Sequence, residues 1–197
     1  MKVAFGLKAH SGWAALVAVG ETAGELFITD RRRVELVEDE WAKQPYHAAE
    51  GLPPKRAREL VARGIAQTKR ISARVLREAL CRELELGNRT VASAVLVGSE
   101  MPDWTVDQIL AVHFRMHQAE GVLFRDVLAQ AAEACGLRLV KIPEKELATH
   151  AEKTLKKPLN FLADKIASLG KSAGPPWGKD QKDATLAALI ALRPHFN

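Results

Sequence analysis

The chain has 197 residues, a formal net charge of +5 and a pI near 9.3, with 47% apolar and 27% charged residues. This length accommodates one domain with a sizeable core, and the composition excludes a disordered or fibrous protein. No uncharged apolar run is long enough to cross a bilayer, the N-terminus lacks the apolar stretch of a signal peptide, and Cys81 and Cys135 lie in helical patterns. We therefore expect a single domain over residues 1–197, located in the cytoplasm, with no membrane partner and no disulfide framework.

Three strands are expected at the start of the chain. Residues 2–8 and 12–20 are rich in Val, Leu and aromatic side chains, and the short polar turn between them predicts a hairpin. A third strand with a partly alternating pattern is expected over 25–37. An irregular connection over 39–54 then leads away from this antiparallel meander.

A long basic helix follows the meander. It is expected to open at Pro53 or Pro54, because proline is tolerated in the first turn, and to end at Gly87-Asn88. Between Lys55 and Arg82 the basic residues outnumber the acidic ones by nine to two. One interpretation is a helix that follows a phosphate backbone, with Arg70 and Arg74 among the contacts. The alternative is a solvated face that covers an apolar stripe.

The second half of the chain alternates between short apolar runs and helical patterns. The run at 91–99 is continuously apolar and ends in turn residues, which is typical of a buried parallel strand. The other expected elements are a helical region at about 105–134, a strand at 137–142, and helices at 143–155, at 156–170 and within 178–192. A meander followed by strand–helix–strand crossovers predicts an α/β fold, in which helices flank a mixed sheet.

This order of elements resembles the ribonuclease H-like superfamily, and in particular its RuvC-like branch of Holliday-junction resolvases. Three stretches carry the likeness. "VAFGLKAHSGWAALVAVGE" (3–21) is similar to the family's first hairpin, and 117–147 is similar to the helix and strand that follow its fourth sheet strand. "DQKDATLAALIAL" (180–192) resembles the final helix, whose D-x-x-D pattern supplies two metal-binding carboxylates.

The resemblance implies a particular chemistry. Enzymes of this fold hydrolyse phosphodiesters with two Mg²⁺ or Mn²⁺ ions about 4 Å apart, held by Asp and Glu because these hard cations prefer oxygen ligands. One carboxylate at the end of the first strand bridges both metals, a second follows the fourth strand, and the others lie on the last helix. By this likeness Asp180 and Asp183 match the last helix, and Glu100 matches the acid of the fourth strand.

The first strand departs from this pattern. Lys8 stands where the resemblance implies the bridging acid, and an ammonium group there would repel both metals. We expect Lys8 to face Asp183, and the preferred structural interpretation is a salt bridge that fills a vacated metal site. The functional interpretation is a phosphate-binding turn made of Lys8, His10 and Ser11. Three further lysines near the final helix extend this candidate surface: Lys171, Lys179 and Lys182.

The two aspartates also have an explanation that involves no metal. Asp180 follows a Pro-Pro-Trp-Gly loop, where its carboxylate could cap a helix by accepting backbone N–H bonds. Asp183 would then lie in the first turn, where a negative charge complements the helix dipole.

A separate pattern concerns histidines. His113, His117 and Glu120 are spaced i, i+4 and i+7 and should lie on one face of a helix. Two imidazoles one turn apart, with a carboxylate beyond them, are a candidate transition-metal site. The alternative is that these histidines pack or form hydrogen bonds.

Three functions remain open at this point. The first is a degenerate, non-catalytic RNase H-like protein that binds nucleic acid or another phosphate-bearing partner, and Lys8 favours it. The second is a metal-dependent nuclease that uses Glu100, Asp180 and Asp183 with Mg²⁺ or Mn²⁺. The third is a protein-interaction scaffold with the long helix as an oligomer interface.

Overall fold

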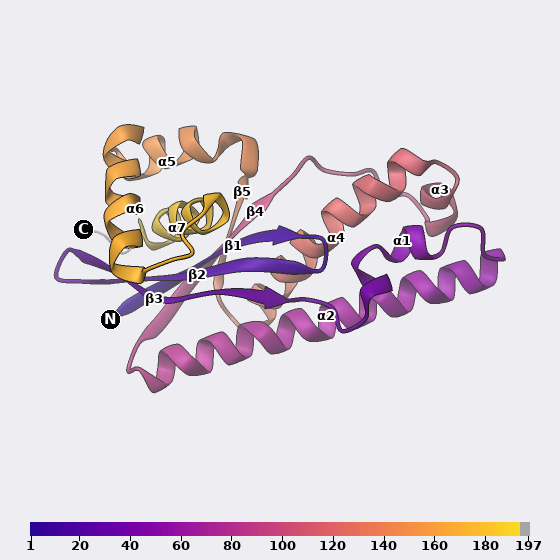
Figure 1. The fold of residues 1–197 in the computed structure, drawn as a ribbon, viewed down its shortest axis with the longest axis horizontal. Helices are drawn as coiled ribbons and strands as arrows, with labels where there is room; N and C mark the ends of the chain where they lie inside the picture. Colours follow the sequence, from indigo (N-terminus) through magenta and orange to yellow (C-terminus); the bar gives the residue numbers. More distant parts are fainter. Residues whose placement is uncertain (194–197) are drawn as a thin grey trace.

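The computed structural model describes residues 1–193, and its centre is a five-stranded mixed sheet in the order β3–β2–β1–β4–β5 (Figure 1). The strands are β1 (Lys2–His10), β2 (Trp13–Thr22), β3 (Glu25–Glu35), β4 (Arg89–Val97) and β5 (Arg138–Pro143). The first three pair antiparallel, whereas β4 runs parallel to β1 and β5 runs parallel to β4. The predicted α/β fold with a meander and parallel strands is therefore confirmed.

Helices cover both faces of this sheet. They are η1 (Glu40–Lys43), α1 (Pro45–Ala48), α2 (Pro54–Glu85), α3 (Val106–Leu110), α4 (His113–Ala134), η2 (Glu144–Glu146), α5 (Leu147–Leu155), α6 (Leu159–Ala173) and α7 (Lys179–Leu192). In Figure 1, α2 and α4 lie on one side of the sheet, and α5, α6 and α7 lie on the other. No helix within residues 1–193 is long and apolar enough to cross a bilayer.

The central strand β1 is buried on both faces and uses each face differently. Its odd positions, including Phe5 and Leu7, pack into the core beneath α2 and α4. Beyond the exposed Lys2, its even positions face α7, and the first two of these are the small residues Ala4 and Gly6. A Cβ atom on Gly6 would lie 1.8 Å from the carbonyl oxygen of Ala184 in α7. The backbones of β1 and α7 are thus in direct contact, and the next even positions of β1 reach the first turns of α7.

The long helix α2 extends beyond the sheet. With 32 residues it is about 48 Å long at 1.5 Å per residue. Its second half packs on the sheet through Ile71 and Leu76, while its first half packs through Val61 into a separate small core with Tyr46 and Met116. This second core joins α2 to α1, α3 and the start of α4.

Three expectations about local structure are wrong. The helix expected over 143–155 begins only at Leu147, because Pro143 ends β5 and 144–146 form η2. The helical region at 105–134 is two helices, because Thr105 and Gln108 form a capping box on α3 and Val112 adopts an extended conformation before α4 starts. The connection over 39–54 is not irregular, since it contains η1 and α1.

Gly6→Ala tests the backbone contact between β1 and α7. The added methyl group would overlap a main-chain carbonyl that cannot rotate away, so we expect a loss of about 2–3 kcal/mol in the free energy of unfolding, measured in urea. Gly121→Ala is the matched control, because a Cβ there meets nothing within 4 Å in α4 and should change stability by about 1 kcal/mol or less, in the favourable direction. Equal effects of the two substitutions would contradict the close contact.

Candidate functional site

The side chain of Lys8 lies at the centre of three carboxylates. Its Nζ atom is 2.7 Å from Oδ2 of Asp183, 3.1 Å from Oε1 of Glu144 and 3.2 Å from Oδ1 of Asp180. The Lys8 side chain is only 6% exposed, and the three carboxylates are more accessible. The contact between Lys8 and Asp183 expected from the sequence is therefore present, within a larger cluster.

The topology brings these residues to one edge of the sheet. Strands β1, β4 and β5 are parallel neighbours, so their carboxyl ends meet at the same edge. Lys8 lies near the end of β1 on the face toward α7, and Glu144 comes directly after β5. Helix α7 begins at this edge and contributes Asp180 and Asp183 from its first two turns.

Asp180 does not cap helix α7, which contradicts the capping interpretation. The N-cap of α7 is Gly178, and its N–H donates a hydrogen bond to Oε1 of Gln181 at 3.0 Å. The carboxylate of Asp180 instead contacts Lys8 and lies 3.2 Å from Nε2 of His10. His10 is the next even position of β1, and its ring stacks on Trp13 with centroids 4.2 Å apart.

The electrostatics keep the amine charged. Burial acts to lower the pKa of Lys8, but hydrogen bonds to Asp183, Glu144 and Asp180 outweigh it and raise the pKa above the ordinary value. Burial acts to raise the pKa of Asp180, but Lys8 and His10 together hold it below the usual range. Around neutral pH the cluster is thus an ammonium ion surrounded by carboxylates.

The charges of the cluster balance. Asp183 also pairs with Lys179, and Glu144 pairs with Nη2 of Arg125 at 3.4 Å. Three acids, Asp180, Asp183 and Glu144, therefore meet three bases: Lys8, Lys179 and Arg125.

The third acid beside Lys8 is Glu144, and not Glu100. Glu100 lies three residues beyond β4, is exposed, and has no ion pair with the Lys8 cluster among residues 1–193. It lines a neighbouring pocket of about 270 Å³ with Asp126 and Lys141. The signal that could have identified Glu144 is its position after a parallel strand, at the edge where the ends of β1 and β4 also lie.

A larger pocket opens beside the cluster. It has a volume of about 760 Å³, and its wall combines Glu144 with the cationic side chains of Arg125, Lys145 and Lys179. Gly98 allows Arg125 to approach, because a Cβ at that position would lie 2.1 Å from Nη1 of Arg125. The pocket thus combines three basic side chains with the acids Glu144 and Glu146, and two of the bases, Arg125 and Lys179, already pair with acids of the cluster.

The candidate phosphate-binding residues are divided among several places. Lys8, His10 and Lys179 join the cluster, whereas Ser11 lines a different pocket with His47. Lys171 and Lys182 flank Trp177 at a hollow of about 330 Å³ between α6 and α7. Arg70 and Arg74 on α2 both pair with Glu38, at 2.9 and 3.7 Å.

The expected histidine pattern is rearranged. His113 and His117 do lie together, with their Nε2 atoms 3.1 Å apart. Glu120 does not join them as the third group, because its buried carboxylate bonds the ring and backbone of His47. The short helix that carries His47 lies in the segment that the sequence suggested was irregular.

Comparison with known proteins agrees with this architecture. No protein-family model and no curated protein matches the sequence. Among solved structures, the chain is similar to RuvC of Thermus thermophilus, with a TM-score of 0.50 and 14% identity over 95% of this chain and 92% of the other. The T. thermophilus RuvC complex with a Holliday junction substrate gives a TM-score of 0.49 and 15% identity over 96% and 92%. At this identity the likeness concerns the fold alone: the chain has the RNase H-like, RuvC-like fold.

Lys8→Met tests how much the Lys8 amine offsets the electrostatic repulsion between the three carboxylates. Without the amine, three acids repel one another in a partly buried site, and we expect the free energy of unfolding to fall by about 3 kcal/mol at pH 7. The deficit should shrink below pH 4, because the repelling acids become protonated in the variant and the wild type loses the same ion pairs as its carboxylates take up protons.

Urea unfolding at a series of pH values checks this expectation. Lys2→Met is the matched control, since Lys2 is an exposed residue of the same strand. A deficit that is equal at pH 3.5 and pH 7 would mean that Lys8 contributes by packing and not by charge.

Proposed function

We propose that the protein is a degenerate member of the RNase H-like fold that binds nucleic acid and does not cleave it. The observation that carries this proposal is the Lys8 amine, which lies within 3.2 Å of three carboxylates at the carboxyl end of β1. The resemblance to RuvC-like proteins implies a carboxylate at this position that bridges two metal ions.

The ammonium group removes the conditions for two-metal chemistry. A charged amine has no lone pair to give to a metal, and the raised pKa of Lys8 keeps it charged throughout the neutral range. The acids that would hold Mg²⁺ or Mn²⁺ already have Lys8, Lys179 and Arg125 as counter-ions. The amine therefore stabilises the carboxylates in the way that a metal would, without activating water.

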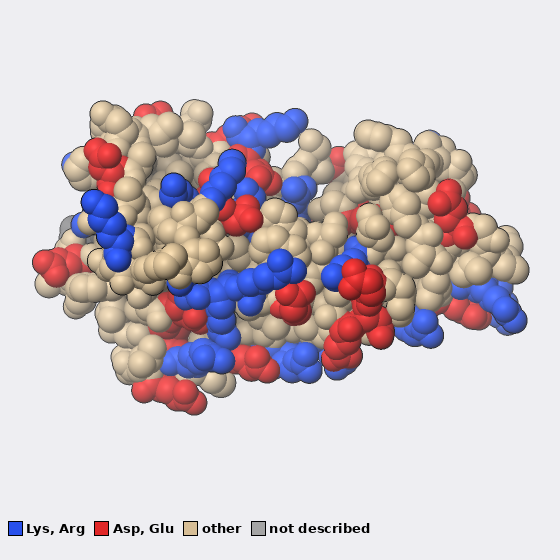
Figure 2. All heavy atoms as spheres, viewed as in Figure 1, with Lys and Arg blue, Asp and Glu red and all other residues tan. Residues whose placement is uncertain are grey.

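The surroundings of the cluster favour an anionic partner. Lys145 lines the large pocket beside Arg125 and Lys179, which also pair with acids of the cluster. Lys171 and Lys182 lie further along α6 and α7 beside Trp177. Figure 2 shows Lys and Arg side chains gathered over β3 and on the region of α6 and α7. Cations along a groove bind phosphates, and an adjacent Trp offers a surface on which a base can stack.

A metal-dependent nuclease is the second candidate, because three carboxylates still converge at the edge where the fold places such a site. Titration of the wild type with Mn²⁺ and incubation with labelled DNA distinguish the two candidates. We expect neither Mn²⁺ binding nor cleavage. Mn²⁺-dependent cleavage that is lost in Asp183→Asn would establish the nuclease and overturn the binding proposal.

Lys8→Asp should restore a divalent-ion site. The substitution removes one positive charge and adds a carboxylate at the position where the resemblance implies the bridging ligand. We expect Mn²⁺ binding in calorimetry and a melting temperature that rises with Mn²⁺ concentration. Lys8→Met is the control, because it removes the cation without adding a ligand. No gain of Mn²⁺ binding in Lys8→Asp would contradict our placement of Lys8.

Double substitution of Lys171 and Lys182 by Ala tests the binding surface. Affinity for duplex, single-stranded and four-way-junction DNA should fall, and the slope of log affinity against log salt should decrease by about two as two phosphate contacts are lost. Arg70→Ala with Arg74→Ala is the matched pair on α2, where Glu38 already occupies both guanidinium groups.

Fluorescence anisotropy over a salt series gives both the affinity for DNA and its dependence on salt. A larger loss of DNA affinity in the Arg70→Ala, Arg74→Ala variant would indicate that the nucleic-acid interface lies on the basic helix α2. Wild-type protein that binds no nucleic acid, or binds it independently of salt, would overturn the proposed function.

A further inference from the structure

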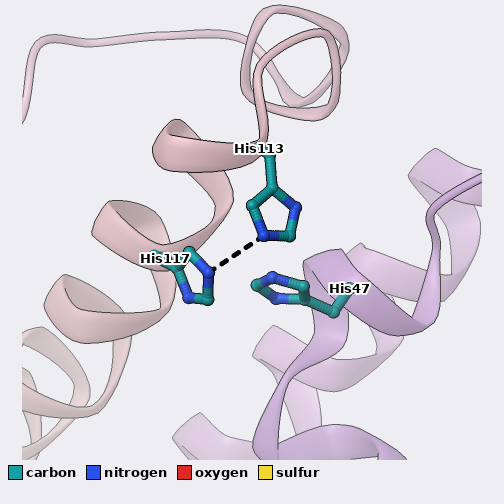
Figure 3. Close-up of side chains that lie close together, drawn as sticks. All are labelled: His47, His113 and His117. Carbon is teal, nitrogen blue, oxygen red and sulfur yellow. Dashed lines mark hydrogen bonds between the residues drawn. The ribbon is translucent and has the colours of Figure 1, made fainter.

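We propose that His47, His113 and His117 form a binding site for a transition-metal ion of the Zn²⁺ class, separate from the carboxylate cluster and independent of the proposed function. One ring nitrogen of each histidine can be chosen so that all three lie within 4.8 Å of one another. Figure 3 shows the three rings directed into a common space, two from the first turns of α4 and one from α1.

The spacing of the rings suits a metal. Two imidazole nitrogens that bind one tetrahedral Zn²⁺ at about 2.0–2.1 Å lie about 3.3 Å apart. The Nε2 atoms of His113 and His117 are 3.1 Å apart. The ring of His47 faces this pair, with its centroid 4.5 Å from that of His117 and 5.1 Å from that of His113. The site is thus close to the geometry of a three-histidine ligand set.

The buried carboxylate of Glu120 fixes the orientation of His47. Its Oε2 accepts the Nδ1–H of His47 at 2.8 Å, and its Oε1 accepts the backbone N–H groups of Tyr46 and His47, each at 3.1 Å. Because Nδ1 is the donor, Nε2 carries the lone pair. A carboxylate that holds one nitrogen of an imidazole so that the other can bind metal is a recurrent arrangement at zinc sites.

The free nitrogen of His47 is a second sign of a ligand. Its Nε2 atom is shielded from solvent and has no hydrogen-bond partner among the described residues. A shielded acceptor without a partner is unfavourable, and a metal ion would satisfy it. Glu120, the most buried carboxylate near the histidines, is 3% exposed and therefore needs the partners that this arrangement provides.

The ligand types select the class of metal. Imidazoles suit Zn²⁺, Co²⁺, Ni²⁺ and Cu²⁺, whereas Mg²⁺ and Mn²⁺ prefer oxygen ligands. His113 and His117 are exposed, so the fourth position of the metal opens to water. The ion would join α1 to the start of α4, across the small core that lies beyond the sheet.

Titration of the EDTA-treated chain of residues 1–197 with Zn²⁺ tests the site. We expect one equivalent to bind, the melting temperature to rise, and Co²⁺ to give the visible absorption of tetrahedral coordination. His47→Ala and His117→Ala should each weaken binding by more than about 100-fold, beyond the 10–100-fold expected for Glu120→Gln, which removes only the orienting group.

His150→Ala is the control, since His150 lies on α5, outside the cluster, and should leave the titration unchanged. Circular dichroism of each metal-free variant verifies folding, and His113→Asn gives a second exposed ligand substitution if His47→Ala does not fold. Zn²⁺ affinity that survives loss of His47, His113 or His117, or no stoichiometric binding by the wild type, would overturn the proposal.

Discussion

The ion cluster around Lys8 is the interaction on which the interpretation of this protein depends. A primary amine is almost completely removed from solvent, and it is stable there because three carboxylates supply the interactions that water would have given. The reverse is also true, since the carboxylates could not remain so close without a cation among them. At this edge of the sheet the Lys8 side chain supplies the positive charge that lets the three acids converge.

Much of the architecture could be predicted from the sequence because its signals are local. The apolar strands of the first hairpin, the continuous run in β4 and the helical spacing of α2 each depend on residues close together in the chain. These features need no knowledge of distant neighbours. The contact of Lys8 with Asp183 joins residues 175 apart in the chain, and it could be inferred only because the resemblance places both residues at one site.

The features that the sequence did not predict depend on contacts between residues far apart in the chain, or on the backbone conformation of a single residue. Glu144 joins the cluster because β5 lies beside β4, and its preceding proline suggested the start of a helix instead of the end of a strand. His47 meets His117 across 70 residues of sequence, and it lies on a helix of only four residues, too short to give a periodic pattern. The break before α4 depends on one extended residue, Val112, within a pattern that is otherwise helical.

The close approach of α7 to Gly6 has a consequence for how such a molecule can change over evolutionary time. The main chain, and not the side chains of the cluster, sets the separation between the central strand and the helix that carries the aspartates. The side chain at position 8 lies beyond this contact, so its chemical type does not set that separation. Two proteins can therefore share such a frame and carry different side chains at its rim, and likeness of shape alone does not reveal what either one does.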